Sequence, residues 1–171
     1  MKSGRNATQA ELNYGLRRVV YDTLVAAKSI DSLSTIGRDY AGKEMAKMAA
    51  LIMARNLHAF LFVPNYSKTD DINVTDFNLS NWQPSSQAHL SPNVYERIHK
   101  IVGHIVASKP NPFKDDKDVN GKLIPLIEQA CDFVRQCRAQ GKAEYTGTAK
   151  YYVRRLNGLL SKFGLAKLPQ L

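Results

Sequence analysis

The stretch that decides the fold is TQAELNYGLRRVVYDTLVAA, residues 8–27. Thr8 and Glu11 have the spacing of a capping box, in which the two side chains satisfy free backbone amides at a helix start. The apolar residues that follow recur at helical spacing: Leu12, Leu16, Val19, Val20, Leu24 and Ala27. The stretch therefore predicts an amphipathic helix, and the looser SIDSLSTIGRD after it, residues 29–39, predicts a break before the next one.

A second helix is expected over about residues 40–62. Its apolar stripe consists of Met45, Met48, Ala49, Ile52, Met53, Phe60 and Leu61. Asn56 falls inside that stripe, which predicts a buried amide that needs partners. Residues 64–91 lose the helical period and carry two prolines and several Asn and Ser, so they predict one long irregular loop.

The remaining chain predicts three more helices. Ser91 followed by a proline is typical of a helix start, and this third helix is expected to end before Pro110. A polar loop over 110–122 should lead to a fourth helix over about 123–140. The fifth is expected over about 146–163. Glycines follow both, at Gly141 and Gly164, as is typical of helix ends.

These patterns predict an all-α bundle of five helices in a single domain over residues 1–171, because no stretch alternates as a strand does. The composition, with 44% hydrophobic and 23% charged residues, is that of a globular chain with a real core. No apolar run approaches the length of a membrane span and no leader pattern begins the chain, so we expect a cytoplasmic protein without a membrane partner.

The net charge of +9 and the pI near 9.6 favour a polyanionic partner such as RNA. A charge that serves solubility alone is the alternative. Cys131 and Cys137 are six residues apart on the expected fourth helix, too far along its axis for a disulfide, so they predict reduced thiols. No zinc-binding spacing and no cofactor-binding glycine motif occurs, which predicts no metal and no cofactor.

The third helix carries the strongest candidate site. On a helical wheel of residues 92–107, its core face consists of Val94, Ile98, Ile101, Val102 and Ile105. The flank beside that face carries Asn93, Arg97, Lys100 and His104. Arg97 and His104 are two turns apart, so both could reach one phosphate. A histidine can relay a proton and an arginine can stabilise the charge of a phosphorane, while RNA supplies its own 2′-hydroxyl as nucleophile.

Three segments over about residues 45–107 resemble bacterial members of the HEPN superfamily. They are ARNLHAFLF (54–62), TDDINVTDF (69–77) and ERIHKIVGHIV (96–106). The family's signature is an arginine and a histidine separated by four to six residues, and it maps onto Arg97 and His104. The resemblance implies a helical bundle and a metal-independent endoribonuclease of the toxin or defence type, whose site is completed across a homodimer. Lys100 and Asn93 would then help to position the phosphate.

Two alternatives to catalysis stay open. Many HEPN members are inactive binding or dimerisation modules, and Ile98 stands where active members typically carry a polar residue. The chain would then be a non-enzymatic adaptor that binds nucleic acid or a partner protein through a basic surface. The other alternative is that the polar flank of Asn93, Arg97, Lys100 and His104 has a purely structural role.

Three further groups carry weaker signals. Lys150, Arg154 and Arg155 lie away from the apolar face of the fifth helix, with Tyr151 among them, which favours phosphate binding and base stacking or a solvated face. The acidic residues of 70–76 (Asp70, Asp71 and Asp76) favour capping over magnesium binding. His58 is expected on the flank opposite the apolar stripe of its helix, as a surface or interhelical polar residue. Finally, the Asp116–Gly121 stretch matches half of a calcium loop but is better explained as a polar turn.

Overall fold

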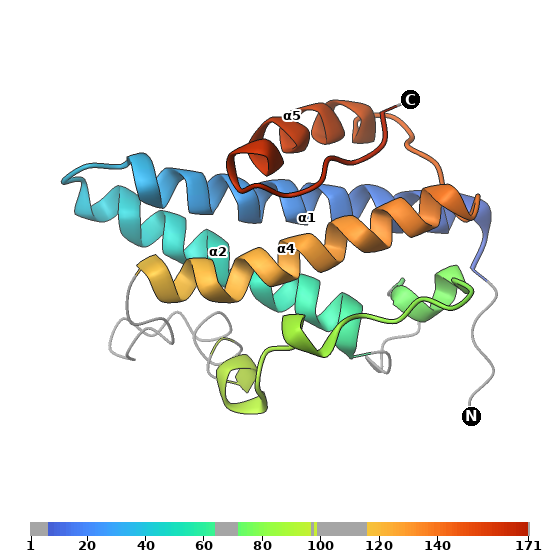
Figure 1. Ribbon diagram of the computed structural model, residues 1–171, viewed down its shortest axis with the longest axis horizontal. Helices are drawn as coiled ribbons and strands as arrows, with labels where there is room; N and C mark the ends of the chain where they lie inside the picture. The colour runs from blue at the N-terminus through green and yellow to red at the C-terminus, as the bar shows by residue number, and fades with distance from the viewer. Residues whose placement is uncertain (1–6, 64–71, 97, 99–115, 171) are drawn as a thin grey trace.

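The computed structural model describes residues 7–63, 72–96, 98 and 116–170. Its helices are α1 (Gln9–Thr35), α2 (Tyr40–Phe62), α4 (Asp116–Ala139) and α5 (Ala149–Lys162), and residues 92–96 form the start of a further helix. No strand occurs within these ranges. The prediction of an all-α bundle of five helices is thus confirmed. As Figure 1 shows, α1 runs through the middle, with α2 and α4 on one side and α5 on the other.

The first helix begins as expected and ends later than expected. The Thr8 side chain accepts from the Glu11 amide, and the Glu11 carboxylate accepts from the Thr8 amide at 2.8 Å, which completes the capping box. The break predicted over 29–39 is wrong up to residue 35, because α1 continues through it. Ile30 and Leu33 are buried and extend the apolar stripe by two turns. The hydroxyl-bearing residues around them face the helix's own carbonyls or solvent and do not interrupt it.

The bounds of α2 agree with the prediction, and its inward face agrees in part: Met53 and Leu61 are buried, and Met48, Ile52 and Phe60 pack against the core. The buried residues are Ala46, Ala50, Leu51, Met53, Ala54, Leu57, His58 and Leu61. Met45, placed in the expected stripe, is 73% exposed, and Asn56 is half-buried rather than buried. Three alanines that were not expected there, Ala46, Ala50 and Ala54, are buried. The prediction that His58 lies on the flank opposite the apolar stripe is wrong, since that side chain is on the buried face.

The fourth helix begins seven residues before its expected start, at Asp116 instead of about residue 123. The polar loop predicted over 110–122 is therefore wrong for its last seven residues, and the stretch around Asn120 is helical rather than a turn. Pro125 lies inside the helix, where its ring nitrogen cannot donate a hydrogen bond. The predicted stop is confirmed: Gly141 has φ +62°, and the Lys142 amide donates to the Cys137 carbonyl at 2.9 Å.

The segment 72–91 crosses the bundle as an irregular strap, as predicted for this part of the loop. It contains two short 3₁₀ turns, η1 (Val74–Phe77) and η2 (Ser86–Ala88), and its green ribbon lies beside α2 and α4 in Figure 1. Side chains of α4 hold it in place. Trp82 Nε1 donates to Asp132 Oδ2 at 2.6 Å, and the Ser85 amide donates to Gln129 Oε1 at 2.8 Å. The capping role expected for Asp76 is confirmed, since its carboxylate accepts from the Asn73 amide.

An aromatic cluster fills the space between the strap and the bundle. The ring of Phe133 on α4 is fully buried, and its centroid lies 4.9 Å from that of Phe77, 5.0 Å from Phe60 and 5.5 Å from Trp82. These rings meet at steep angles, as aromatic pairs prefer. The cluster therefore joins α2, α4 and the strap into one core.

Helix α5 covers α1, and the chain then folds back along α5. Asn157 on α5 holds the returning segment by two hydrogen bonds, donating to the Leu168 carbonyl at 3.0 Å and accepting from the Leu168 amide at 2.7 Å. Lys162 forms an ion pair with Asp31 of α1 at 2.7 Å. Within the described residues, no helix is both long and apolar enough to cross a membrane.

Candidate functional site

A groove lies where α5 meets α1. It encloses about 450 Å³ and is lined by Tyr14, Arg17, Arg18, Tyr21, Thr148 and Tyr152. Four of these residues come from α1 at successive spacings of three, one and three, which places them on a single face of that helix. Thr148 precedes the first turn of α5, and Tyr152 lies one turn further on. The packing of α5 on α1 thus turns one face of α1 into the floor of a groove.

Arginine and tyrosine side chains lie next to one another in this groove. The Arg17 guanidinium lies 5.0 Å from the centre of the Tyr14 ring, and the Arg18 guanidinium lies 5.9 Å from that of Tyr21. Tyr21 in turn lies 5.3 Å from Tyr152. The ring of Tyr14 is 55% exposed, although tyrosine usually buries most of its ring. The groove therefore offers aromatic faces and positive charges to one ligand.

The basic residues predicted on the fifth helix are exposed but do not line the groove. Lys150, Arg154 and Arg155 are exposed on α5, as is Tyr151, whose ring lies 6.0 Å from that of Tyr152. This places one of the predicted aromatics beside the tyrosines of the groove. The structure thus joins part of the predicted basic face to a row of α1 residues that the sequence analysis did not single out.

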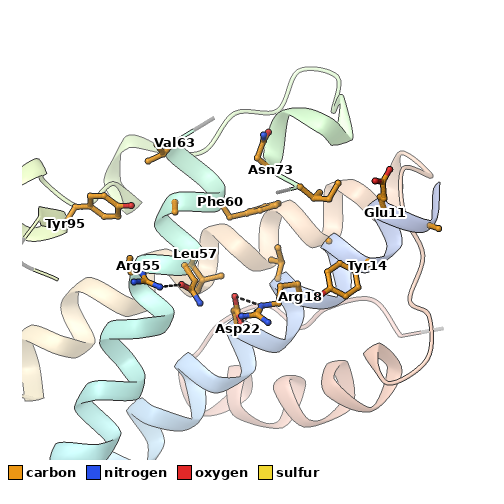
Figure 2. Close-up of a pocket in the computed structure, with 16 residues that line it drawn as sticks. Glu11, Tyr14, Arg18, Asp22, Arg55, Leu57, Phe60, Val63, Asn73 and Tyr95 are labelled. Carbon is orange, nitrogen blue, oxygen red and sulfur yellow. Dashed lines mark hydrogen bonds and ion pairs between the residues drawn. The ribbon is translucent and has the colours of Figure 1, made fainter. Parts of the chain in front are cut away.

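A larger cavity of about 840 Å³ lies between α1 and α2 (Figure 2). Its apolar wall includes Leu57, Phe60 and Val63 of α2 and Ile72 of the strap. Its polar residues are Glu11, Tyr14, Arg18, Asp22, Arg55, Asn56, Asn73 and Tyr95. Since Tyr14 and Arg18 line both hollows, the cavity and the groove adjoin along α1.

The polar end of the cavity is organised around Asp22. This carboxylate is 5% exposed, and Arg18 Nε donates to its Oδ2 at 3.3 Å. The same nitrogen lies 3.2 Å from Oδ1, but Oδ1 accepts no hydrogen bond from the described residues. Arg55 Nη2 donates to Asn56 Oδ1 at 3.3 Å on the neighbouring α2. Burial raises the pKa of Asp22, and the Arg18 charge and contacts with Arg18 and Asn56 oppose that rise.

The residues predicted on the third helix are only partly visible. Arg97, Lys100 and His104 lie outside the described residues, as do Asp70 and Asp71. Asn93 is exposed in the helical start that Pro92 opens. Ile98 is fully buried, as expected for the core face, and Tyr95 lines the cavity between α1 and α2. The start of the third helix thus lies beside that cavity.

His58 is buried in an aromatic setting and not in a polar one. Its ring centroid lies 4.6 Å from that of Tyr95, 4.7 Å from His89 and 5.1 Å from Phe62. Burial, and then the charge of His89, lowers the pKa of His58 to about 4, while a backbone hydrogen bond at Leu90 acts in the opposite direction. The histidine is therefore neutral at physiological pH.

We expect this histidine to make the protein less stable in mild acid. Its pKa is lower in the folded chain than the ordinary value of 6.5, so stability is constant above that value and falls as the pH drops from 6.5 towards 4. At pH 5 the loss should be about 2 kcal/mol relative to pH 7.5. Urea unfolding at the two pH values measures it. His58→Leu should lose most of the difference and the exposed control His89→Gln should keep most of it. If His58→Leu lost as much stability between pH 7.5 and pH 5 as the wild type, His58 would not be the group that causes the loss.

The two cysteines are free and buried, as the sequence predicts. Burial raises the pKa of Cys131 to about 12 and raises that of Cys137 as well, so both stay protonated. Within residues 7–63, 72–96, 98 and 116–170, no three His, Cys, Asp or Glu side chains gather as ligands of a metal ion. The chemistry of the described site is therefore carried by arginine, tyrosine and one buried carboxylate.

Comparison of the chain with known protein families, with functionally characterised proteins and with solved structures finds no match.

The α1 row of Tyr14, Arg17, Arg18 and Tyr21, together with Asp22, is not among the residues predicted from the sequence. The signal was present, because tyrosine and arginine recur at helical spacing on the face next to the apolar stripe. The residues that face them from α5 and α2 are more than 30 positions away in the chain, so helical spacing alone does not bring them together.

Proposed function

We propose that the protein binds single-stranded RNA in the groove between α1 and α5, as a helical bundle of HEPN type. The observation that carries the proposal is that Tyr14 and Tyr21 flank Arg17 and Arg18 on one face of α1, with each arginine near a tyrosine ring. Aromatic side chains stack on the bases of a single strand, and arginines contact its phosphates. Both kinds of group lie within one groove here.

Charge supports the same proposal. The chain carries +9 at neutral pH, and Lys150, Arg154 and Arg155 add exposed positive charge on α5. A basic surface attracts nucleic acid over long range and binds it with an affinity that falls as salt rises. Stacking needs unpaired bases, which favours a single strand over a duplex. The HEPN resemblance favours RNA over DNA.

Cleavage of that RNA is the second part of the proposal, and it depends on the HEPN resemblance. Arg97 and His104 would stabilise and protonate the reacting phosphate, with Lys100 and Asn93 as positioning residues. The exposure of Asn93 at the start of the third helix is compatible with that role. A homodimer and a cytoplasmic location belong to the same proposal.

The test is the binding of a fluorescein-labelled 12-nucleotide oligouridylate, measured by anisotropy as a function of salt. We expect Tyr21→Ala to weaken binding about tenfold, because a stacked base is lost. Replacing Lys150, Arg154 and Arg155 together by glutamine should lower the slope of log affinity against log salt by up to about 2, since each phosphate contact contributes about 0.7. Tyr40→Ala, at an exposed tyrosine on the first turn of α2, is the matched control and should bind normally.

Two results would contradict the proposal. One is equal affinity of wild type, Tyr21→Ala and Tyr40→Ala. The other is tighter binding to a 12-base-pair duplex than to the single strand, because a duplex has no unstacked bases to offer the tyrosines.

A further inference from the structure

We infer that Arg17 is the arginine of α1 that binds a phosphate of the strand in the groove, and that Asp22 keeps Arg18 from doing so. The inference rests on the proposed function, because it concerns the positive charges of the same groove. Asp22 does not itself line the groove. It is a positioning residue that acts through Arg18 and limits how many phosphates the groove contacts.

Arg18 is already paired with a carboxylate of its own helix. Its Nε lies 3.2 Å from Asp22 Oδ1 and donates to Oδ2 at 3.3 Å, and a dashed line in Figure 2 joins the two side chains. The Asp22 side chain is only 7% exposed, and contacts with Arg18 and Asn56 hold it in place. A phosphate that approaches the Arg18 guanidinium therefore meets the negative charge of Asp22 directly behind it, which offsets much of the attraction.

Arg17 has no such partner. The residue is half-buried, and no carboxylate of the described residues forms an ion pair with it. Its guanidinium lies 5.0 Å from the centre of the Tyr14 ring, a contact that leaves the positive charge in place. A partly buried charge costs free energy while it has no counter-charge, and a phosphate is a favourable partner for a guanidinium. Arg17 therefore gains more than Arg18 from an anionic ligand.

The position of Arg17 fits a strand that lies between the two helices. A Cβ added to Gly147 would lie 4.0 Å from Arg17 Nη1, so this nitrogen reaches from α1 towards the loop before α5. Thr148, the next residue of that loop, lines the groove. None of the described residues that line the groove is acidic, and the first turn of α5 carries no acidic residue either. A phosphate beside Arg17 thus meets no opposing carboxylate from these residues.

The two neighbouring arginines therefore make unequal contributions to binding. With Asp22 ionised, α1 presents one uncompensated positive charge to the strand instead of two. Each phosphate contact with a single strand adds about 0.7 to the slope of log affinity against log salt. Removal of the Asp22 charge should add one contact, and removal of the Arg17 charge should subtract one.

The test measures the salt dependence of binding at pH 7.5 for two fluorescein-labelled 12-nucleotide strands. One is oligouridylate, and the other is an abasic strand that has the phosphates without the bases. We expect Asp22→Asn to steepen the salt dependence by about 0.7 with both strands, and Arg18→Gln added to Asp22→Asn to abolish that gain. Arg17→Gln should make it shallower by about 0.7. A change that merely loosened the fold would weaken binding and would not steepen its salt dependence.

Asp31→Asn is the matched control on the same helix. It frees Lys162 from its ion pair and changes the net charge by the same amount as Asp22→Asn, but neither Asp31 nor Lys162 lines the groove. Its salt dependence should equal that of the wild type. A gain in Asp31→Asn as large as in Asp22→Asn would show that net charge alone matters, which overturns the inference.

The other outcomes separate this inference from the proposed function. An unchanged salt dependence in Asp22→Asn overturns the inference. So does an unchanged one in Arg17→Gln, which leaves Asp22 intact and covers the case in which Asp22→Asn does not fold. If Tyr21→Ala binds oligouridylate as tightly as the wild type while the abasic strand shows the expected changes, stacking in the groove is refuted and the assignment of the arginines stands. A wild type that binds neither strand overturns both.

Discussion

Replacement of Phe133 by alanine is expected to lower the free energy of unfolding by about 3–5 kcal/mol, the usual range for a buried phenylalanine. The ring is fully buried and contacts Phe60 of α2, Phe77 of η1 and Trp82 of the strap. Its removal therefore leaves a void between α2, α4 and the strap. It also deletes the aromatic pairs. Urea unfolding followed by circular dichroism measures the loss.

The control for Phe133→Ala is Tyr151→Ala. That ring is 57% exposed on α5, so its removal should change stability by less than about 0.5 kcal/mol. A loss below about 1 kcal/mol in Phe133→Ala would show that the strap does not depend on this ring.

His104→Ala is expected to reduce RNA cleavage by at least 100-fold, the usual lower limit for removal of a general acid or base. The expectation rests on the HEPN resemblance and on the chemistry of an arginine and a histidine at one phosphate. Arg97→Ala should have an effect of the same order, because it removes the group that stabilises the transition-state charge. Cleavage of a uridine-rich RNA in the presence of EDTA, followed on a gel, measures both.

His99→Ala is the matched control, since it removes a histidine from the same stretch of sequence without altering the Arg97–His104 pair. Cleavage that persists in His104→Ala would exclude the assignment. A composite site also requires two copies of the chain, so a strict monomer by light scattering at micromolar concentration would exclude that version of the mechanism. Binding without cleavage in the wild type would leave the chain as an RNA-binding adaptor.

The sequence predicts the ends of the helices well where capping or helix-stop residues mark them. The capping residues Thr8 and Glu11, the Ser91–Pro92 pair and the glycine at 141 all act within a few residues, and each marks the helix end that it predicts. The misplaced bounds arise where polar residues occupy the outer face of a continuing helix. In 29–35, burial of Ser29, Ile30 and Leu33 on one side maintains the helix although its composition is that of a loop, and residues 116–122 are likewise helical despite a loop-like composition.

The inward face of α2 shows a second limit. Met45 is exposed although methionine is strongly apolar, whereas the smaller Ala46, Ala50 and Ala54 are buried. Which face is buried depends on the partner helix, and the sequence of one helix does not contain that information. His58 was misplaced for the same reason.

The residues of the candidate site also fall into some that the sequence predicts and some that it does not. The basic residues of α5 could be predicted because they oppose a regular apolar stripe. The groove and the cavity could not, because each exists only where two helices meet. Tyr14 and Arg18 are ordinary exposed-face residues on a helical wheel, and they become site residues only through the packing of α5 and α2 beside α1.

The hydrogen bond between Trp82 and Asp132 allows the docking of the strap to be followed by tryptophan fluorescence. The chain has one tryptophan, so all indole emission comes from the strap. The indole is half-buried, donates to a carboxylate on α4 and touches the Phe133 ring. Detachment of the strap would transfer that indole to water and shift its emission to longer wavelength, while the helices would keep their ellipticity. Fluorescence and circular dichroism, recorded on one sample, thus separate the docking of the strap from the folding of the bundle.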